Sequence, residues 1–358
     1  MPTRILITGA GGFVGSQIAL SLLDQHENLQ IVGVDNLSRS GSAANVVPLR
    51  KAGIDFRHSD VRMPSDLEAI TRCDWIIDAA AHPSVLAGTS GHSSSRQVVE
   101  NNLHGTLNLL ELCRRWDAGF VFLSSSRVYS IRQLSQLSVV AREEQYVYEG
   151  EVAIPGVSPT GIREDFSQAA PLSFYGATKA ASETLASEYG ETFEFPVWIN
   201  RCGILAGATQ FGRPDQGIFT FWLHRWREKK PLKYIGFGGH GYQVRDCLHP
   251  RDVASLISKQ MSAGRDLSKP SVVNVSGGIE SARSLLQVSR WCQERWGPHS
   301  VAADDSERRF DLPWLVLDAD LAQRTWQWKP TRSTEEILHE IAEHAEQNPG
   351  WDELSNQY

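Results

Sequence analysis

The chain has 358 residues, of which 41% are hydrophobic and 22% are charged, a length that suits one large globular domain or two cooperating ones. Its formal net charge of −7 argues against nucleic-acid binding, which needs many basic side chains facing phosphates, and no apolar stretch approaches the ~18 residues that span a bilayer. The five cysteines have no metal-type spacing. We therefore expect reduced thiols, no metal site, no membrane contact and a cytoplasmic location.

Short apolar runs alternate with helical patterns through the first half of the chain. The pattern predicts strands at 4–10, 31–35, 55–60, 75–81 and 119–125, and helices at 13–25 and 102–115. Strands that alternate with helices imply right-handed crossovers and a parallel sheet. We predict an α/β fold, with a Rossmann-type doubly wound parallel sheet and a smaller interleaved C-terminal domain. The predicted dinucleotide-binding domain comprises 1–195 and about 232–262, and the predicted substrate domain about 196–231 and 263–358.

The stretch "ILITGAGGFVGS" is the first chemical motif. Gly9, Gly12 and Gly15 follow a predicted strand directly and open a helix, where a turn without Cβ atoms lets a pyrophosphate approach the backbone and the helix N-terminus. Asp35 ends the next strand about 20 residues later, where a carboxylate binds ribose hydroxyls and repels a 2′-phosphate. The motif therefore predicts NAD, although Arg39 nearby is a side chain that can serve NADP, and a purely structural glycine turn is the alternative.

Neighbouring residues complete the predicted cofactor site. Phe13 and Val14 lie in the glycine turn, Asn36, Leu37 and Ser38 follow Asp35, and Asp60 and Val61 end the third strand near the expected adenine position. For Asp60, a simple strand-end cap is an equally good interpretation.

The second motif is "FYGATK". Tyr175 and Lys179 are four positions apart on a predicted helix and so share a face. Tyrosine has an ordinary pKa near ~10, and a neighbouring ammonium group together with a cationic nicotinamide favours the phenolate. Such a pair can accept a proton from a sugar or alcohol hydroxyl. An exposed helix pair without function is the alternative, and the preceding dinucleotide motif argues against it.

Together these motifs resemble the extended short-chain dehydrogenase/reductase family over essentially the whole chain. The resemblance rests on "TGAGGFVG", Asp35, "DAAAHPSV", "NNLHGTLNLLE", "SSSRVYS" and "YGATK". In that family the catalytic Ser or Thr precedes the tyrosine of the "VY" pair by four positions, which selects Ser125 from Tyr129. The resemblance implies that Ser125 binds the reacting oxygen, that Tyr175 takes its proton and that Lys179 binds the nicotinamide ribose. It further implies cofactor contacts from Ala79, Ala80, Ala81, Asn102 and Cys202.

Family members that dehydrate nucleotide sugars carry an Asp-Glu pair directly after the catalytic residue. This chain has Ser126 and Arg127 there, and neither side chain can act as an acid or base at neutral pH. A 4,6-dehydratase is therefore disfavoured. Arg127 is expected to bind a substrate anion or to close a surface ion pair.

Downstream, "QFGRPDQGIFTFWLHR" and "YIGFGGHGYQVRDCLHPRDV" resemble CDP-paratose (CDP-tyvelose) 2-epimerases. This resemblance implies a nucleotide-diphosphate sugar that is oxidised at C2 and reduced again, with no net redox change. The implied substrate-binding residues are His82, Ser126, Arg127, Gln210, Asp215, Gln216, Gly217, Arg245 and Arg308. Guanidinium groups suit phosphate geometry, which is the reason for the arginines.

Alternatives stay open at this point. Many members have an asparagine where this chain has Ile204, which leaves the nucleotide base undefined and argues mildly against a UDP-sugar 4-epimerase. A net NAD(P)-dependent sugar-nucleotide reductase or dehydrogenase, and a non-enzymatic dinucleotide sensor, are further alternatives. Residues 130–170 are expected to form a lid over the sugar, because loops of this length are usually functional. By analogy with relatives, we also expect a homodimer.

Overall fold

The computed structural model describes residues 2–89, 94–150 and 154–354. Its centre is a seven-stranded sheet in which every paired strand is parallel. The strand order is β15 (Val272–Val275), β10 (Val197–Cys202), β5 (Gly119–Ser125), β4 (Trp75–Asp78), β1 (Thr3–Thr8), β2 (Leu29–Asp35) and β3 (Asp55–His58). The order reverses between β1 and β4, which is the position where doubly wound sheets bind ligands.

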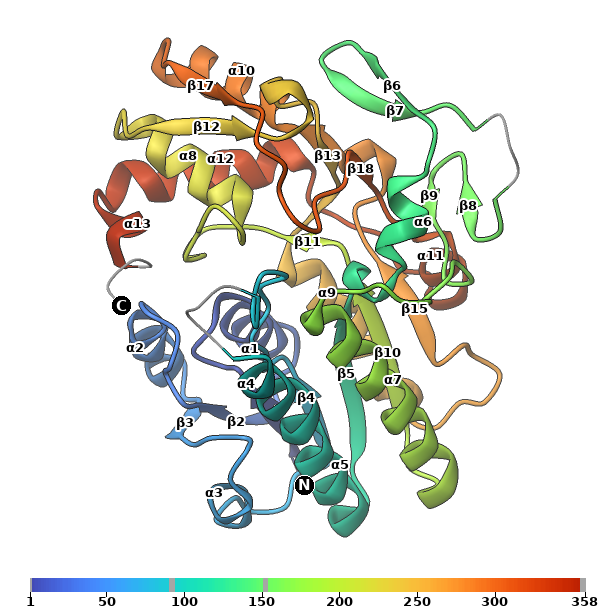
Figure 1. Cartoon of the computed structure of the whole chain (residues 1–358). Helices are drawn as coiled ribbons and strands as arrows, with labels where there is room; N and C mark the ends of the chain where they lie inside the picture. Colours follow the sequence, from blue (N-terminus) through green and yellow to red (C-terminus); the bar gives the residue numbers. More distant parts are fainter. Residues whose placement is uncertain (1, 90–93, 151–153, 355–358) are drawn as a thin grey trace.

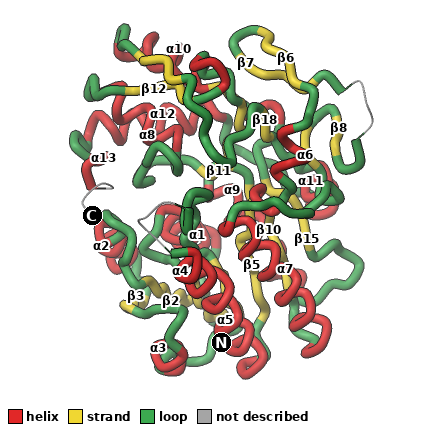
Figure 2. Tube along the Cα trace, in the orientation of Figure 1, coloured by secondary structure: helices red, strands yellow, loops and turns green. Residues whose placement is uncertain are grey.

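Both faces of the sheet are buried, as the apolar strands predict. Along β1, Ile5 and Ile7 enter one core with α1 and α9, whereas Leu6 enters the opposite core with α5. Figures 1 and 2 show the helices arranged on the two sides of the sheet. The flanking helices are α1 (Phe13–Gln25), α2 (Ala43–Lys51), α3 (Pro64–Glu68), α4 (Ser95–Val99), α5 (Gly105–Trp116), α7 (Phe174–Phe193), α9 (Pro250–Ala263) and α11 (Asp320–Trp326). A five-residue π-helical segment, Glu100–His104, joins α4 to α5. The predicted fold class is confirmed.

A second layer of structure lies over the carboxyl ends of the strands (Figure 1). It has its own apolar core, built from α8, α10 and α12 around Trp222 and Trp226. Its elements are β11 (Ile204–Leu205), α8 (Ile218–Arg227), β12 (Leu232–Ile235), β13 (Val244–Arg245), β14 (Cys247–Leu248), β16 (Arg283–Ser284), α10 (Leu285–Trp296), β17 (Val301–Asp304), β18 (Trp314–Leu315), α12 (Thr334–Gln347) and α13 (Trp351–Leu354).

Several strands cross the predicted domain boundaries. β10 and β15 were assigned to the substrate domain by sequence, yet both are hydrogen-bonded into the central sheet. β12 was assigned to the dinucleotide domain, yet it pairs with β17 in the second layer. The division into two domains therefore remains a prediction, and these three strands mark where its limits differ from the sheet pairing.

The segment 130–170 does not form the expected lid. Its described residues form α6 (Ile131–Ser135) and two hairpins, β6 (Val139–Arg142) with β7 (Gln145–Tyr148) and β8 (Val157–Ser158) with β9 (Gly161–Ile162). They pack on an apolar cluster around Trp314 and Leu317, and none of them lines the main cleft. Residues 151–153 of this segment lie outside the described residues. Apolar packing against β18 therefore directs this segment away from the cleft.

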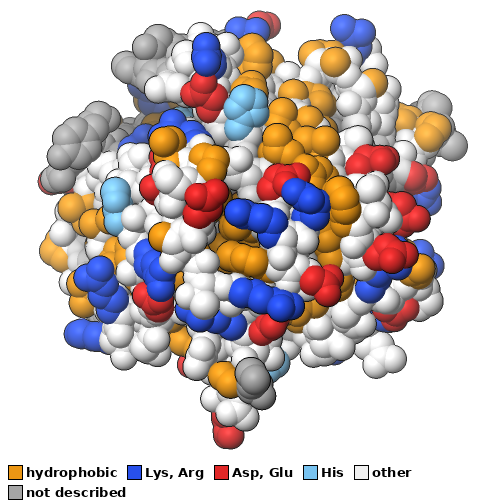
Figure 3. All heavy atoms as spheres, turned by 90° about the horizontal axis from the view of Figure 1, so that it is seen from below, with side chains coloured by type: hydrophobic (Ala, Val, Ile, Leu, Met, Phe, Trp, Pro, Cys, Tyr) orange, Lys and Arg blue, Asp and Glu red, His pale blue; other side chains and the backbone are white. Residues whose placement is uncertain are grey.

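The distribution of charged side chains on the surface agrees with the formal net charge of −7. On the face in Figure 3, basic and acidic side chains are interspersed with hydrophobic ones, without a continuous basic area. Among the described residues, no helix is long and apolar enough to cross a membrane.

Candidate active site

A cleft of about 870 Å³ is lined by the carboxyl ends of the central strands and by residues of the second layer. Its volume is in the range of small-molecule sites. Its walls include the glycine turn after β1, the end of β5, the first turns of α7 and the loop before α8. The topology therefore brings the two sequence motifs to one cavity.

The glycine turn is packed too closely for larger residues. Gly9 has φ +63°, and a Cβ on it would lie 2.7 Å from the Ala79 carbonyl oxygen. A Cβ on Gly15 would lie 2.2 Å from the Gly9 carbonyl oxygen. No side chain of the described residues caps the N-terminus of α1, where Gly12 is the N-cap. The first-turn amides therefore face the cleft as an anion site, which fits a pyrophosphate.

Asp35 ends β2 and lines the cleft. It accepts hydrogen bonds from the Gly11 amide at 3.0 Å and the Leu37 amide at 2.7 Å, while burial raises its pKa. The Arg39 guanidinium donates instead to the Phe211 carbonyl at 2.8 Å and to the Gln216 side chain. Arg39 thus connects the loop after β2 to the loop before α8. Its guanidinium is already hydrogen-bonded to protein groups and is not free to bind the 2′-phosphate of NADP. The site fits NAD.

Ser125 and Tyr175 meet at the cleft. Ser125 ends β5, Tyr175 lies in the first turn of α7, and both side chains line the cleft. Burial raises the pKa of Tyr175, while the nearby Ser125 hydroxyl and the Arg127 charge act to lower it. Protein groups alone therefore do not produce the phenolate that the sequence predicted.

The sequence predicted that the Lys179 ammonium group acts on the Tyr175 phenol, and in the structure Lys179 has a different hydrogen-bond partner. Lys179 is buried and its Nζ donates to the Leu123 carbonyl at 2.7 Å, lying 4.3 Å from the centroid of the Phe122 ring. Burial lowers the pKa of Lys179, against the opposing effect of Asp78. The lysine lines the same cleft as Tyr175, and the charge that acts directly on the phenol is that of Arg127.

Arginines gather around the other end of the site. The backbone amide of Arg127 donates to Ser125 Oγ at 3.2 Å, and its guanidinium donates to the Phe310 carbonyl at 3.2 Å. Among the described residues no carboxylate forms an ion pair with Arg127, whereas Arg245 pairs with Asp311 at 2.8 Å. Burial lowers the pKa of Arg127 to about 10. Arg308 donates to the Pro214 carbonyl at 2.7 Å. This end of the cleft is therefore suited to anionic groups.

The loop after β4 forms the remaining wall. The His82 amide donates to Asn102 Oδ1 at 2.7 Å, and Asn102 in turn donates to Thr178 of α7 at 3.1 Å. His82 Nδ1 is buried without a hydrogen-bond partner among the described residues, and burial lowers the pKa of this histidine. Ser84 Oγ donates to Asp215 at 2.5 Å across the cleft. Asn102 therefore holds the loop after β4 against α7, although it does not line the cleft itself.

Most of the predicted site residues line this one cleft; Leu37, Asp60 and Asn102 do not. Asp60 faces Arg62 and Asn36 instead, and the hydrogen bond from Arg62 lowers its pKa to about 2. Lining residues that sequence reasoning missed include Ser84, Phe211, Arg213, Trp222, Arg283, Arg309 and Phe310. The first four lie within the stretches "DAAAHPSV" and "QFGRPDQGIFTFWLHR", whereas the last three lie outside every quoted motif, and only the tertiary structure shows that all of them face the site.

Fold and cleft define a dinucleotide-binding enzyme with a serine, tyrosine and lysine site. The model of the NAD dependent epimerase/dehydratase family matches residues 5–276, and the chain belongs to this family. The predicted family, enzyme class and NAD cofactor are confirmed.

Similar curated proteins cover nearly the whole chain. The CDP-paratose 2-epimerase of Salmonella typhi is 28% identical over 346 residues, covering 94% of this chain and 98% of its own length. The UDP-glucuronate 4-epimerase of Thermodesulfobacterium geofontis is 27% identical over 353 residues, covering 96% of each.

The fold is also shared with solved structures. The UDP-glucuronic acid 4-epimerase of Bacillus cereus, solved with UDP-glucuronic acid and NAD, has a TM-score of 0.74 at 24% identity, covering 96% of this chain and 99% of that one. The UDP-glucose 4-epimerase of Thermus thermophilus, solved with NAD, has a TM-score of 0.74 at 25% identity, with the same coverage.

Proposed function

We propose that the protein epimerises a nucleoside-diphosphate sugar at C2, with a CDP-paratose-like or CDP-tyvelose-like substrate. The observation that carries the proposal is that Ser125 and Tyr175 line one cleft, together with Arg127 at the position where a dehydratase needs an acid. Arg127 is half-buried and, with its pKa lowered to about 10, stays protonated at neutral pH, so it cannot support elimination of water. Oxidation and re-reduction without elimination is then the reaction that these side chains support.

In the proposed reaction, Tyr175 removes the proton of the C2 hydroxyl while Ser125 donates a hydrogen bond to the same oxygen. NAD, when bound, would supply the hydride acceptor for this oxidation and the hydride donor for the reduction that follows. Tyr175 gives the proton back at the end of the cycle, so no net redox change occurs. Lys179 is assigned to the nicotinamide ribose, on the same side of the cleft.

Substrate groups are assigned to the remaining lining residues. Arg245 and Arg308 suit the diphosphate, since guanidinium groups bind phosphate oxygens in a fork geometry. Gln210, Asp215, Gln216 and Gly217 lie before or at the start of α8 and are assigned to the sugar nucleotide, with His82 and Ser126 near the sugar. We further propose a homodimer that acts in the cytoplasm.

A 4-epimerase acting on a UDP-sugar is the second candidate. The similarity to the UDP-glucuronate 4-epimerase over 96% of the chain supports it. The two candidates use the same catalytic side chains and differ in which sugar carbon faces Tyr175. Ile204 lies in β11 beside the cleft, at a position where many family members have an asparagine. This difference argues mildly against the second candidate.

The test is an incubation of the purified protein with CDP-, UDP-, GDP- and dTDP-sugars in D₂O, followed by NMR. Epimerisation of CDP-tyvelose at C2 without deuterium incorporation supports the proposal. Deuterium at the epimerised carbon contradicts the hydride route, and turnover of UDP-glucuronic acid at C4 establishes the second candidate. The Tyr175→Phe variant, which retains the ring but not the hydroxyl, serves as the control and is expected to be inactive.

A further inference from the structure

A row of buried polar side chains crosses the sheet beside Ser125. Ser124, Arg201 and Asn274 occupy matching register positions on three adjacent strands, β5, β10 and β15. All three are buried, and Glu183 reaches them from α7, the helix that carries Tyr175. None of these four residues has a role in the proposed reaction.

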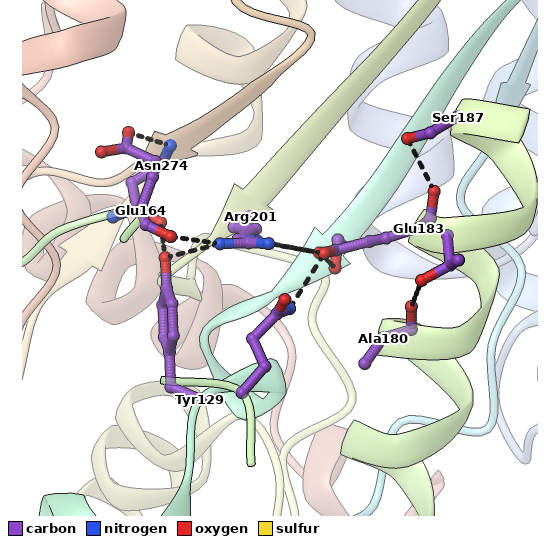
Figure 4. A network of polar contacts seen from close by, with 10 residues as sticks. Tyr129, Glu164, Ala180, Glu183, Ser187, Arg201 and Asn274 are labelled. Atoms are coloured by element: carbon purple, nitrogen blue, oxygen red, sulfur yellow. Dashed lines mark hydrogen bonds and ion pairs between the residues drawn. The ribbon is translucent and has the colours of Figure 1, made fainter. Parts of the chain in front are cut away.

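The Glu183 carboxylate is the centre of this network (Figure 4). It accepts a hydrogen bond from Ser124 Oγ at 2.5 Å, and Arg201 binds it through Nη2 at 2.7 Å and Nε at 3.0 Å. Gln168 Nε2 adds a fourth contact at 3.1 Å. The Glu183 and Arg201 side chains are each only 7% exposed. Both carboxylate oxygens are therefore bound by more than one donor.

The other end of the network reaches the segment that follows Ser125. Figure 4 shows Arg201 between Glu183 and Tyr129. Arg201 Nη1 donates to the Tyr129 hydroxyl at 3.2 Å, and this hydroxyl donates to Asn274 Oδ1 at 2.6 Å. The network thus binds Ser124 on one side of Ser125 and Tyr129 on the other.

Stability alone does not account for such an arrangement. A buried ion pair loses the hydration of both charges, and a well-packed apolar substitute is often as stable. A fully satisfied polar network instead fixes one geometry. Glu183 lies eight positions after Tyr175 on the same helix, so it fixes that geometry relative to the phenol.

We propose that Glu183 is a positioning residue, which acts through Ser124 and Arg201 to hold Ser125 in place in the cleft that it shares with Tyr175. The inference rests on the proposed function, because that function gives Ser125 and Tyr175 their roles. Removing the Glu183 contact to β5 should then displace the Ser125 hydroxyl relative to Tyr175 while leaving the fold intact.

Two serine substitutions form a matched pair for the test. Ser124→Ala removes the hydroxyl that binds the Glu183 carboxylate, which stays paired with Arg201. Ser187→Ala removes a hydroxyl that donates to the Glu183 backbone carbonyl at 3.0 Å and does not touch the carboxylate. Each variant loses one hydrogen bond to Glu183. Only Ser124→Ala removes a contact of the carboxylate at the centre of the network.

The first readout is the pKa of Tyr175, measured by NMR on NAD-saturated protein with ¹³C-labelled tyrosine, and assigned with Tyr175→Phe. The side chains that act on this phenol are Ser125, Arg127 and Cys202, of which the first two lower its pKa and the thiol raises it. Ser124→Ala is expected to raise the pKa by about 0.5 unit or more, since the Ser125 hydroxyl that lowers it is displaced, and Ser187→Ala is expected to leave it unchanged. A lower melting temperature without a pKa shift would mean a purely structural role and overturn the inference.

The second readout is a double-mutant cycle with CDP-tyvelose as substrate. Ser124→Ala is expected to lower kcat by about 3- to 10-fold at unchanged KM, and to have no further effect in the Ser125→Ala background. Equal losses in both backgrounds contradict the inference. If Ser125→Ala itself leaves kcat unchanged, or CDP-tyvelose is not turned over, the proposed function fails instead, and the titration alone decides the role of Glu183.

Discussion

His224 makes the stability of the second layer sensitive to acid. It lies in α8 and is 1% exposed, and among the described residues neither ring nitrogen has a hydrogen-bond partner. Its ring centroid is 5.5 Å from that of His344 in α12. Burial and, next, the neighbouring His344 lower the pKa of His224 to about 4, against the opposing charges of Asp352 and Glu228.

The direction of the effect follows from proton linkage. Because the folded-state pKa of about 4 lies below the ordinary histidine value of 6.5, the unfolded chain binds the proton first as the pH falls. The free energy of unfolding is therefore unaffected by His224 above about pH 7, and decreases as the pH falls from about 6.5 towards 4. Between pH 7 and pH 4.5 the expected loss from this one group is about 2 kcal/mol.

The assay is urea unfolding at pH 7 and pH 4.5, followed by tryptophan fluorescence, for the wild type and His224→Leu. Leucine is similar in size and does not titrate, while the other ionisable groups remain in both proteins. The wild type should lose about 2 kcal/mol more than the variant between the two pH values. Equal losses would show that His224 is solvated or partnered in solution, and would refute the reasoning.

Three further predictions concern the site. Tyr175→Phe should lower kcat by about 10²- to 10⁴-fold while bound NAD, quantified after denaturation, stays at wild-type level. Gly15→Ala should reduce the bound NAD and the melting temperature together, because its Cβ would lie 2.2 Å from the Gly9 carbonyl oxygen; a wild-type NAD content would contradict the packing argument. Asp35→Ala should lower the NAD-to-NADP affinity ratio at least about tenfold in calorimetric titrations, since the carboxylate that repels a 2′-phosphate is gone; an unchanged ratio would assign the selectivity to another residue.

Local sequence determined the fold class and the location of the chemistry. Short apolar runs and helical apolar patterns reflect which faces must be buried, so the five predicted strands and both predicted helices of the first half appear in the structure. The glycine turn and Asp35 were equally readable, because their backbone geometry tolerates few other residues.

Only the tertiary structure decided what surrounds that chemistry. The sheet places Ser124, Arg201 and Asn274 in one row although they are far apart in the chain, and no local pattern encodes strand register between distant segments. The partner of Lys179 and the path of residues 130–170 likewise depend on long-range packing. The interior is closely packed, so the position of each side chain near the cleft depends on all the elements that surround it. These positions are therefore fixed only when the elements are assembled.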